Sequence, residues 1–137
     1  MKLCVKRYSE LTRDELYALV KLRIAVFIVE QNCPYMELDD WDQAAVHVWL
    51  EDDEGIEAYL RVMDRGVESE HVSIGRVIAV KRRSGIGTQV LSEGIRVANT
   101  KLNLKLYHLW VSFTPWRCFI PVNVALLRLP PFSLATA

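Results

Sequence analysis

The segment that most constrains the fold runs from Ser73 to Thr88 and reads SIGRVIAVKRRSGIGT. A β-branched, apolar run leads through a basic turn with two glycines into the start of a helix. A strand that passes directly into a helix directs several backbone N–H groups at one point, and such a point attracts anions. The three consecutive cations Lys81-Arg82-Arg83 add charge-assisted donors. We therefore predict that residues 82–88, called the glycine corner below, bind phosphate.

Two other glycine motifs do not fit the corner. A dinucleotide-binding fingerprint needs a third glycine where this chain has Val90, and an NTPase phosphate loop needs a lysine where Thr88 is followed by Gln89. A turn that only relieves strain between a strand and a helix remains the alternative on local chemistry alone.

The composition indicates one domain, residues 1–137, with one core. Seventeen basic and seventeen acidic residues cancel, which argues against bulk binding to nucleic acid or to an acidic membrane. Three cysteines at no metal-ligand spacing indicate neither a disulfide framework nor a zinc site, and no metal is expected. We find no secretory signal and no span of about 20 apolar residues, so we expect a soluble, cytoplasmic protein.

Element signals appear along most of the chain. The alternation at Leu3 and Val5 predicts a first strand. A capping box formed by Thr12 and Glu15 predicts a helix that ends by about Asn32, because Cys33 precedes Pro34.

Three further strands and a second helix follow. The strands are predicted at 46–50, at 56–62 with one core face and one wet face, and at 71–80 with a bulge near Gly75. The helix is predicted from Gly87 to Ala98, with small residues toward the sheet. This order predicts an α+β (mixed α/β) fold with a mostly antiparallel sheet flanked by helices.

An acidic loop follows Pro34. Its carboxylates either rim a pocket for a cationic acceptor or form a solvated face, and the solvated face is the more common outcome. These carboxylates belong to Glu37, Asp39, Asp40 and Asp42.

The sequence resembles the GNAT acyltransferases. Arg82-Arg83-Ser84-Gly85-Ile86-Gly87 fits their Arg-x-x-Gly-x-Gly signature. The run from Val26 to Tyr35, together with His47 and Ile74-Gly75-Arg76-Val77, resembles the ElaA group, and the similarity extends from about Ser9 to Ala98.

The resemblance implies a site for acetyl-CoA. Its pyrophosphate would lie against Arg82, Arg83, Ser84, Gly85, Ile86, Gly87 and Thr88, and its pantetheine arm would bond the backbone of Ile78 and Val80. The implied activity is N-acetyl transfer to a small-molecule or peptide amine by direct attack. Glu30 and His47 are the candidate bases, although a helix-end glutamate and a strand histidine without catalytic roles are the plainer interpretations.

The resemblance ends near Thr100. The family continues with a Tyr-x-x-x-Gly-Phe type segment, whereas this chain has no glycine after Gly94 and one later tyrosine, Tyr107. We hypothesise that residues 101–137 are frame-shifted or replaced; a divergent native ending is the alternative. Two other functions stay open: a non-catalytic acyl-CoA-binding protein, and, disfavoured by the balanced charge, a nucleic-acid-binding domain. The apolar tail is also compatible with a homodimer.

Overall fold

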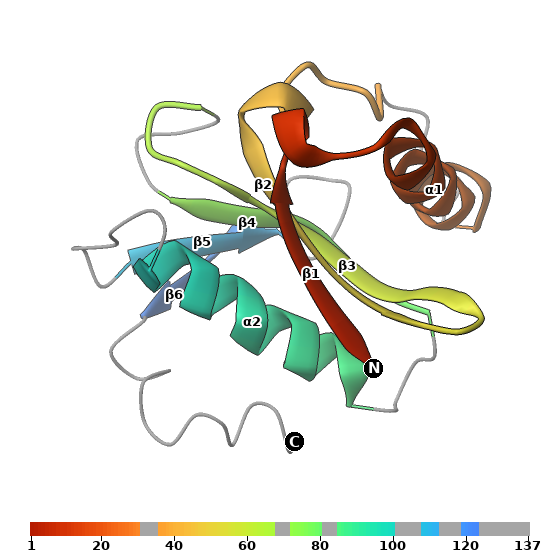
Figure 1. The fold of residues 1–137 in the computed structure, drawn as a ribbon. Coiled ribbons are helices and arrows are strands. Elements are labelled where there is room, and N and C mark those ends of the chain that lie inside the picture. The colour runs from red at the N-terminus through yellow and green to blue at the C-terminus, as the bar shows by residue number, and fades with distance from the viewer. Residues whose placement is uncertain (31–35, 68–71, 81–84, 101–107, 113–118, 124–137) are drawn as a thin grey trace.

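A six-stranded sheet with the order β1 to β6 forms the centre of the computed structural model (Figure 1). The structure describes residues 1–30, 36–67, 72–80, 85–100, 108–112 and 119–123. The first four strands are antiparallel, β5 lies parallel to β4, and β6 is antiparallel to β5. The strands are β1 Lys2–Arg7, β2 Ala45–Asp52, β3 Gly55–Met63, β4 Ser73–Ala79, β5 His108–Ser112 and β6 Phe119–Asn123. The mostly antiparallel sheet with flanking helices confirms the predicted fold class.

The predicted N-terminal cap is present. Thr12 Oγ1 accepts from the Glu15 N–H at 3.1 Å, and Glu15 Oε1 accepts from the Thr12 N–H at 3.0 Å. These two bonds satisfy N–H groups that a helix start leaves without intrahelical partners. The helix α1, Arg13–Arg23, begins at this cap and continues into a π-helical segment, η2 Ile24–Glu30.

The helices lie on opposite sides of the sheet (Figure 1). On one side, α1 and η2 supply Leu19 and Phe27 to a core with Trp49, Tyr59 and Ile78. On the other side, α2, Ile86–Thr100, packs on alternate residues of the same strands. In the described ranges, neither helix is both long enough and apolar enough to cross a bilayer.

The expectation of a wet face on the third strand is wrong. Both faces of β3 are covered, because α1 and the segment before β2 lie over the face opposite α2. The residues predicted to face water, Glu57, Tyr59, Arg61 and Met63, are at most 5% exposed. Two of the four carry charge, so this buried face needs internal partners for them.

The second helix matches its prediction closely. A Cβ on Gly94 would lie 2.9 Å from both Leu60 methyl groups, so the absence of a side chain lets α2 approach the sheet. The expected bulge near Gly75 is also present. Tyr59 pairs with Ile78 and Arg61 pairs with Gly75, so two residues of β4 oppose one of β3.

Two 3₁₀ turns complete the described elements, η1 Tyr8–Glu10 after β1 and η3 Asp42–Ala44 before β2. The second turn carries Asp42 into the interior next to His47 and Arg61.

Candidate functional site

The end of β4 and the start of α2 lie next to each other. A Cβ on Gly87 would be 3.4 Å from the Ala79 Cβ, which places the first turn of α2 against the end of the strand. Gly85 has φ +81°, a conformation that glycine adopts without strain. The Gln89 N–H donates to the Gly85 carbonyl at 3.1 Å, so the amides before Gln89 precede the first bond of the helix. Donors of this kind suit an anion.

The structure covers part of the predicted corner. Gly85, Ile86, Gly87 and Thr88 lie at the helix start, as expected for a strand-to-helix junction. Arg82, Arg83 and Ser84 fall outside the described residues, and their roles stay predictions.

The backbone at the end of β4 points differently from the prediction. The Val80 N–H donates to the Glu57 carbonyl at 2.8 Å, so this amide faces β3. Backbone groups alternate sides along a strand, and the register therefore turns Ile78 toward β3 as well. The backbone groups of Ala79 face the opposite edge.

That edge is paired with β5 near the start of β4, through Ser73–Trp110 and Ile74–Val111. Among the described residues, no pairing with β5 extends to Ala79. A linear ligand with amide groups could add to this part of the strand.

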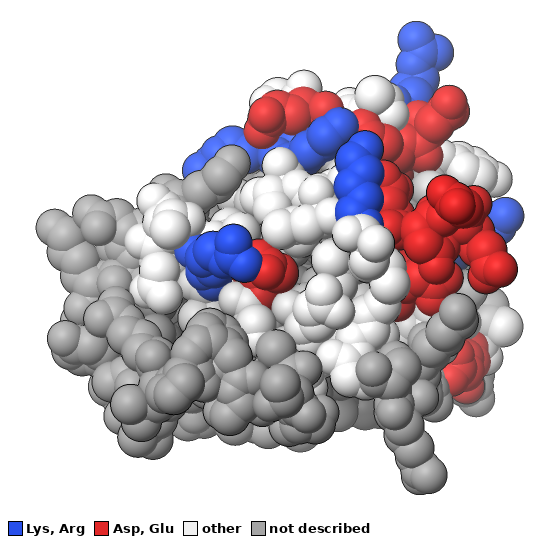
Figure 2. Space-filling model, turned by 60° about the horizontal axis from the view of Figure 1, so that its bottom comes forward, with Lys and Arg blue, Asp and Glu red and all other residues white. Residues whose placement is uncertain are grey.

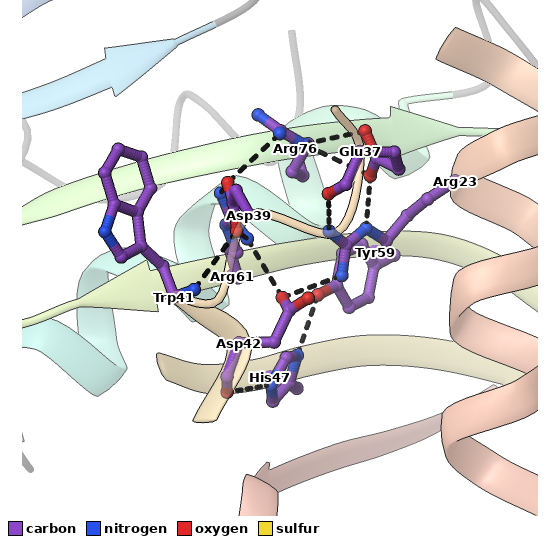
Figure 3. A network of polar contacts seen from close by, with 9 residues as sticks. All are labelled: Arg23, Glu37, Asp39, Trp41, Asp42, His47, Tyr59, Arg61 and Arg76. Carbon is purple, nitrogen blue, oxygen red and sulfur yellow. Dashed lines mark hydrogen bonds and ion pairs between the residues drawn. The ribbon is translucent and has the colours of Figure 1, made fainter. Parts of the chain in front are cut away.

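Three arginines and three carboxylates form a buried network on the α1 side of the sheet (Figure 3). Arg23 comes from α1, Arg61 from β3 and Arg76 from the bulge of β4. The carboxylates all come from the segment before β2 and belong to Glu37, Asp39 and Asp42. Three positive and three negative charges cancel, which is the condition under which charged groups tolerate burial.

Asp42 lies at the centre of this network. Its Oδ1 accepts from Arg23 Nη1 at 2.8 Å and from Arg61 Nη1 at 2.9 Å. Arg23 also reaches Glu37 Oε1 through Nε at 2.6 Å, and Arg61 forms an ion pair with Asp39. Arg23 is 0% exposed and Arg61 1% exposed. One carboxylate therefore joins two arginines that are both removed from water.

Arg76 closes the network at the outer strand. Its Nε lies 3.1 Å from Glu37 Oε2, and its Nη2 lies 3.2 Å from Asp39 Oδ2. Arg76 has φ +55°, which costs a non-glycine residue conformational energy. The two ion pairs fix the bulge in this geometry.

Both interpretations of the acidic loop are wrong for these carboxylates. Glu37 and Asp42 are each 5% exposed, and they bind arginines of the same chain instead of facing water or a cationic acceptor. Asp40 is the exception: it is exposed and has φ +67°.

The network sets the ionisation of its carboxylates. Burial opposes the charge on Asp42, yet Arg23 and Arg61 hold the pKa of this group below its usual value. For Asp39, burial also opposes the charge, but the hydrogen bond and charge of Arg61, the Trp41 N–H and the charge of Arg76 together lower the pKa. Both groups are therefore carboxylates at neutral pH.

His47 is held inside the same network. Its Nε2 lies 3.0 Å from the Asp42 carbonyl oxygen, which only accepts, so Nε2 carries the proton. Its Nδ1 lies 2.7 Å from the Tyr59 hydroxyl and accepts from it. Burial lowers the pKa of His47 and raises the pKa of Tyr59 to about 12. With both ring nitrogens bonded, this geometry is unfavourable for the predicted role as general base.

The other predicted base, Glu30, is exposed at the end of η2. The structure does not bring it together with His47 through a contact among the described side chains. A role in proton transfer stays a prediction for Glu30.

A shallow cleft of about 500 Å³ lies between α1 and the β2–β3 hairpin. Apolar side chains such as Leu22, Trp49 and Ile56 line it, and its charged residues are Asp14, Glu15, Lys21 and Glu51. Two of its carboxylates are paired with lysines, because Glu15 lies 2.8 Å from Lys6 and Glu51 lies 3.6 Å from Lys2.

The three arginines of the network were not predicted as site residues. The usable signal was the combination of Arg61 in a strand with a carboxylate-rich loop, because a charged residue in a covered strand requires a buried partner.

Comparison with known proteins assigns the chain to a family. Escherichia coli ElaA is 40% identical over 92 residues, which cover 63% of this chain and 59% of ElaA. A Mycobacterium tuberculosis UPF0039 protein is 43% identical over 83 residues, 58% of this chain and 53% of its own length. The chain thus spans little more than half of the length of these relatives.

The solved structures extend the match. A Pseudomonas aeruginosa acyl-CoA N-acyltransferase superposes with a TM-score of 0.73 at 34% identity, over 81% of this chain and 76% of its own. The crystal structure of Escherichia coli ElaA superposes with a TM-score of 0.71 at 31% identity, over 80% and 76% of the two chains. The chain belongs to the ElaA-like group of GNAT acyltransferases. No family model matches this GNAT chain.

Proposed function

We propose that this chain binds acetyl-CoA where β4 meets α2 and transfers the acetyl group to an amine. One observation carries the proposal. In this GNAT chain the edge of β4 adjoins the glycine-containing start of α2, with Gly87 and Ala79 in van der Waals range. A strand edge suits the pantetheine amides and a helix start suits the pyrophosphate.

The donor contacts are divided between the strand and the corner. Arg82, Arg83 and Ser84 supply charge and loop amides, and Gly85, Ile86, Gly87 and Thr88 supply the helix start. For the pantetheine arm, we replace the predicted backbone of Ile78 and Val80 with that of Ala79. The support is the bond from Val80 to Glu57, which turns both neighbouring amides toward β3.

The proposed reaction is direct attack on the thioester. The amine nitrogen bonds to the carbonyl carbon and loses a proton, and the resulting oxyanion accepts a backbone N–H bond near the end of β4. The tetrahedral intermediate then collapses, the C–S bond breaks, and the CoA thiolate takes up a proton. Glu30 is the favoured base because its exposed position at the end of η2 lets its carboxylate exchange a proton with water, whereas His47 is buried.

The acceptor is proposed to be a small-molecule or peptide amine. The cleft between α1 and the β2–β3 hairpin offers an apolar lining for the acceptor, through Leu22, Trp49 and Ile56. We also propose a single domain over 1–137, a cytoplasmic protein and self-association through the apolar tail.

The second candidate function is acyl-CoA binding without catalysis. It is favoured by the mismatch after Thr100, where the family's tyrosine segment does not occur. Such a protein would bind acetyl-CoA saturably and release no free CoA with any amine. Reading the coding DNA in its other two frames past codon 100 tests the frame-shift explanation.

Calorimetry of acetyl-CoA against the wild type and Gly85→Glu tests donor binding. The variant places a carboxylate where the pyrophosphate is proposed and is expected to weaken binding by at least about tenfold, since about 1.4 kcal/mol of lost interaction gives that factor. Unchanged binding would remove the corner from the proposal.

Gly66→Glu is the matched control, because Gly66 has φ +85° and lies in an exposed turn before β4. It carries the same new charge and a similar backbone strain away from the corner. Equal losses in both variants would indicate general destabilisation. Thiol release from acetyl-CoA with a panel of amines then separates transfer from binding alone.

A further inference from the structure

The β2–β3 hairpin concentrates negative charge. Its seven residues from Glu51 to Glu57 carry five carboxylates. Lys2 Nζ lies 3.6 Å from Glu51 Oε1, with a side chain that is 75% exposed, and this is the one ion pair that the described residues give to residues 51–57. An exposed pair of this length compensates little charge. Figure 2 shows acidic side chains gathered at the side of the molecule where the hairpin lies in Figure 1.

Three of the five carboxylates converge. One oxygen each from Asp52, Glu54 and Glu57 lies within 4.8 Å of the others. Ca²⁺ holds oxygen ligands at about 2.3–2.6 Å, so ligands on opposite sides of one ion are about 4.6–5.2 Å apart. The three oxygens are therefore spaced on the scale of one Ca²⁺ coordination shell. Mg²⁺, with ligands at about 2.0–2.1 Å, would need a tighter arrangement.

Glu57 distinguishes this cluster from ordinary surface acids. Glu57 is 5% exposed, and its Oε2 is buried with no hydrogen-bond partner among the described residues. A buried carboxylate oxygen that has lost its water is costly unless another group replaces that water. Asp52 and Glu54 lie at the surface beside it, where an ion can enter.

We propose that Asp52, Glu54 and Glu57 bind a divalent cation of the Ca²⁺ type, with water in the remaining coordination positions. The Glu57 carbonyl also accepts the Val80 N–H, so an ion held by the Glu57 side chain stabilises the strand end that leads into the glycine corner.

Calorimetric titration of the EDTA-treated full chain with CaCl₂ tests the site. We expect saturable binding of one ion per chain with a Kd on the order of 10⁻⁴–10⁻³ M, a rise in Tm with CaCl₂, and weaker binding of MgCl₂. Asp52→Asn and Glu54→Gln should each weaken Ca²⁺ binding by about tenfold or more because each removes a charged ligand. Glu57→Gln should do the same, and the two surface variants keep the test valid if it folds poorly.

Asp53→Asn is the matched control, since it removes the same charge from the same hairpin outside the converging trio. It should leave the affinity within about twofold, by the weakness of screened surface charge. Equal weakening by Asp52→Asn and Asp53→Asn would indicate diffuse attraction and overturn the site. Absence of both heat and Tm shift up to about 10 mM CaCl₂ would also overturn it.

Discussion

Asp42→Asn is expected to destabilise the fold strongly. The substitution keeps the size of the side chain but removes the negative charge that joins Arg23 to Arg61, which leaves three buried cations against two carboxylates. Removing one partner from a buried ion pair costs about 3–5 kcal/mol, because the other charge stays out of water. The remaining amide oxygen can still accept one bond, so we expect about 3 kcal/mol.

Urea unfolding measures this cost. For an m-value of about 2 kcal/mol/M, the midpoint should fall by about 1.5 M. Asp40→Asn is the control: it makes the same change two residues away at an exposed position, and its φ of +67° suits asparagine as well as aspartate. It should stay within about 0.5 kcal/mol of the wild type. If Asp42→Asn costs less than about 1 kcal/mol, the network does not bear buried charge as described.

Three further predictions concern the capping box, the helix–sheet contact and the buried histidine. Thr12→Ala should lower the free energy of unfolding by about 1 kcal/mol in urea, since the Glu15 N–H loses its acceptor; no change would mean that water replaces the cap. Gly94→Val should cost about 1–3 kcal/mol by the same assay, because its Cβ would meet both Leu60 methyls at 2.9 Å, and an unaffected midpoint would show that Leu60 moves freely. Burial lowers the pKa of His47 in the folded chain. As the pH falls below about 6.5, the histidine is therefore protonated in the unfolded chain before it is protonated in the folded chain. The free energy of unfolding should decline from there by at most about 1.4 kcal/mol per pH unit. His47→Gln should remove that slope between pH 7 and 5; an equal slope would assign it to another group.

Local patterns in the sequence predicted local structure well. The capping box involves residues three apart, and the bulge near Gly75 and the strand-to-helix passage at Gly85 lie within single short segments. In each case the residues that decide the backbone conformation are neighbours along the chain. Such features depend little on the rest of the fold.

The buried network could not be found in this way. Arg76 meets Glu37 across 39 positions, and Arg61 meets Asp39 across 22. A carboxylate-rich loop has the same composition whether it is solvated or covered by arginines from distant strands. The alternation in β3 gave the correct core face but could not reveal that α1 covers the other face.

Backbone direction was a second limit. The resemblance placed donor contacts on Ile78 and Val80, but a sequence motif does not specify which edge of a strand an amide faces. The pairing register specifies which edge each amide faces, and the Val80–Glu57 bond shows that the amides of Ile78 and Val80 face β3. The bulge just before these residues decides which edge their amides face, since an added residue reverses the direction of the amides that follow.

The network and the bulge are therefore mechanically linked. The φ of +55° at Arg76 is unfavourable by about 1–3 kcal/mol, and the ion pairs to Glu37 and Asp39 are among the contacts that offset it. Relaxing Arg76 would change the path of β4 between Gly75 and Ala79, where we propose that the donor binds. Substitutions of Glu37 or Asp39 would then weaken acetyl-CoA binding although neither residue contacts the donor, because these buried charges fix the edge of β4 that receives it.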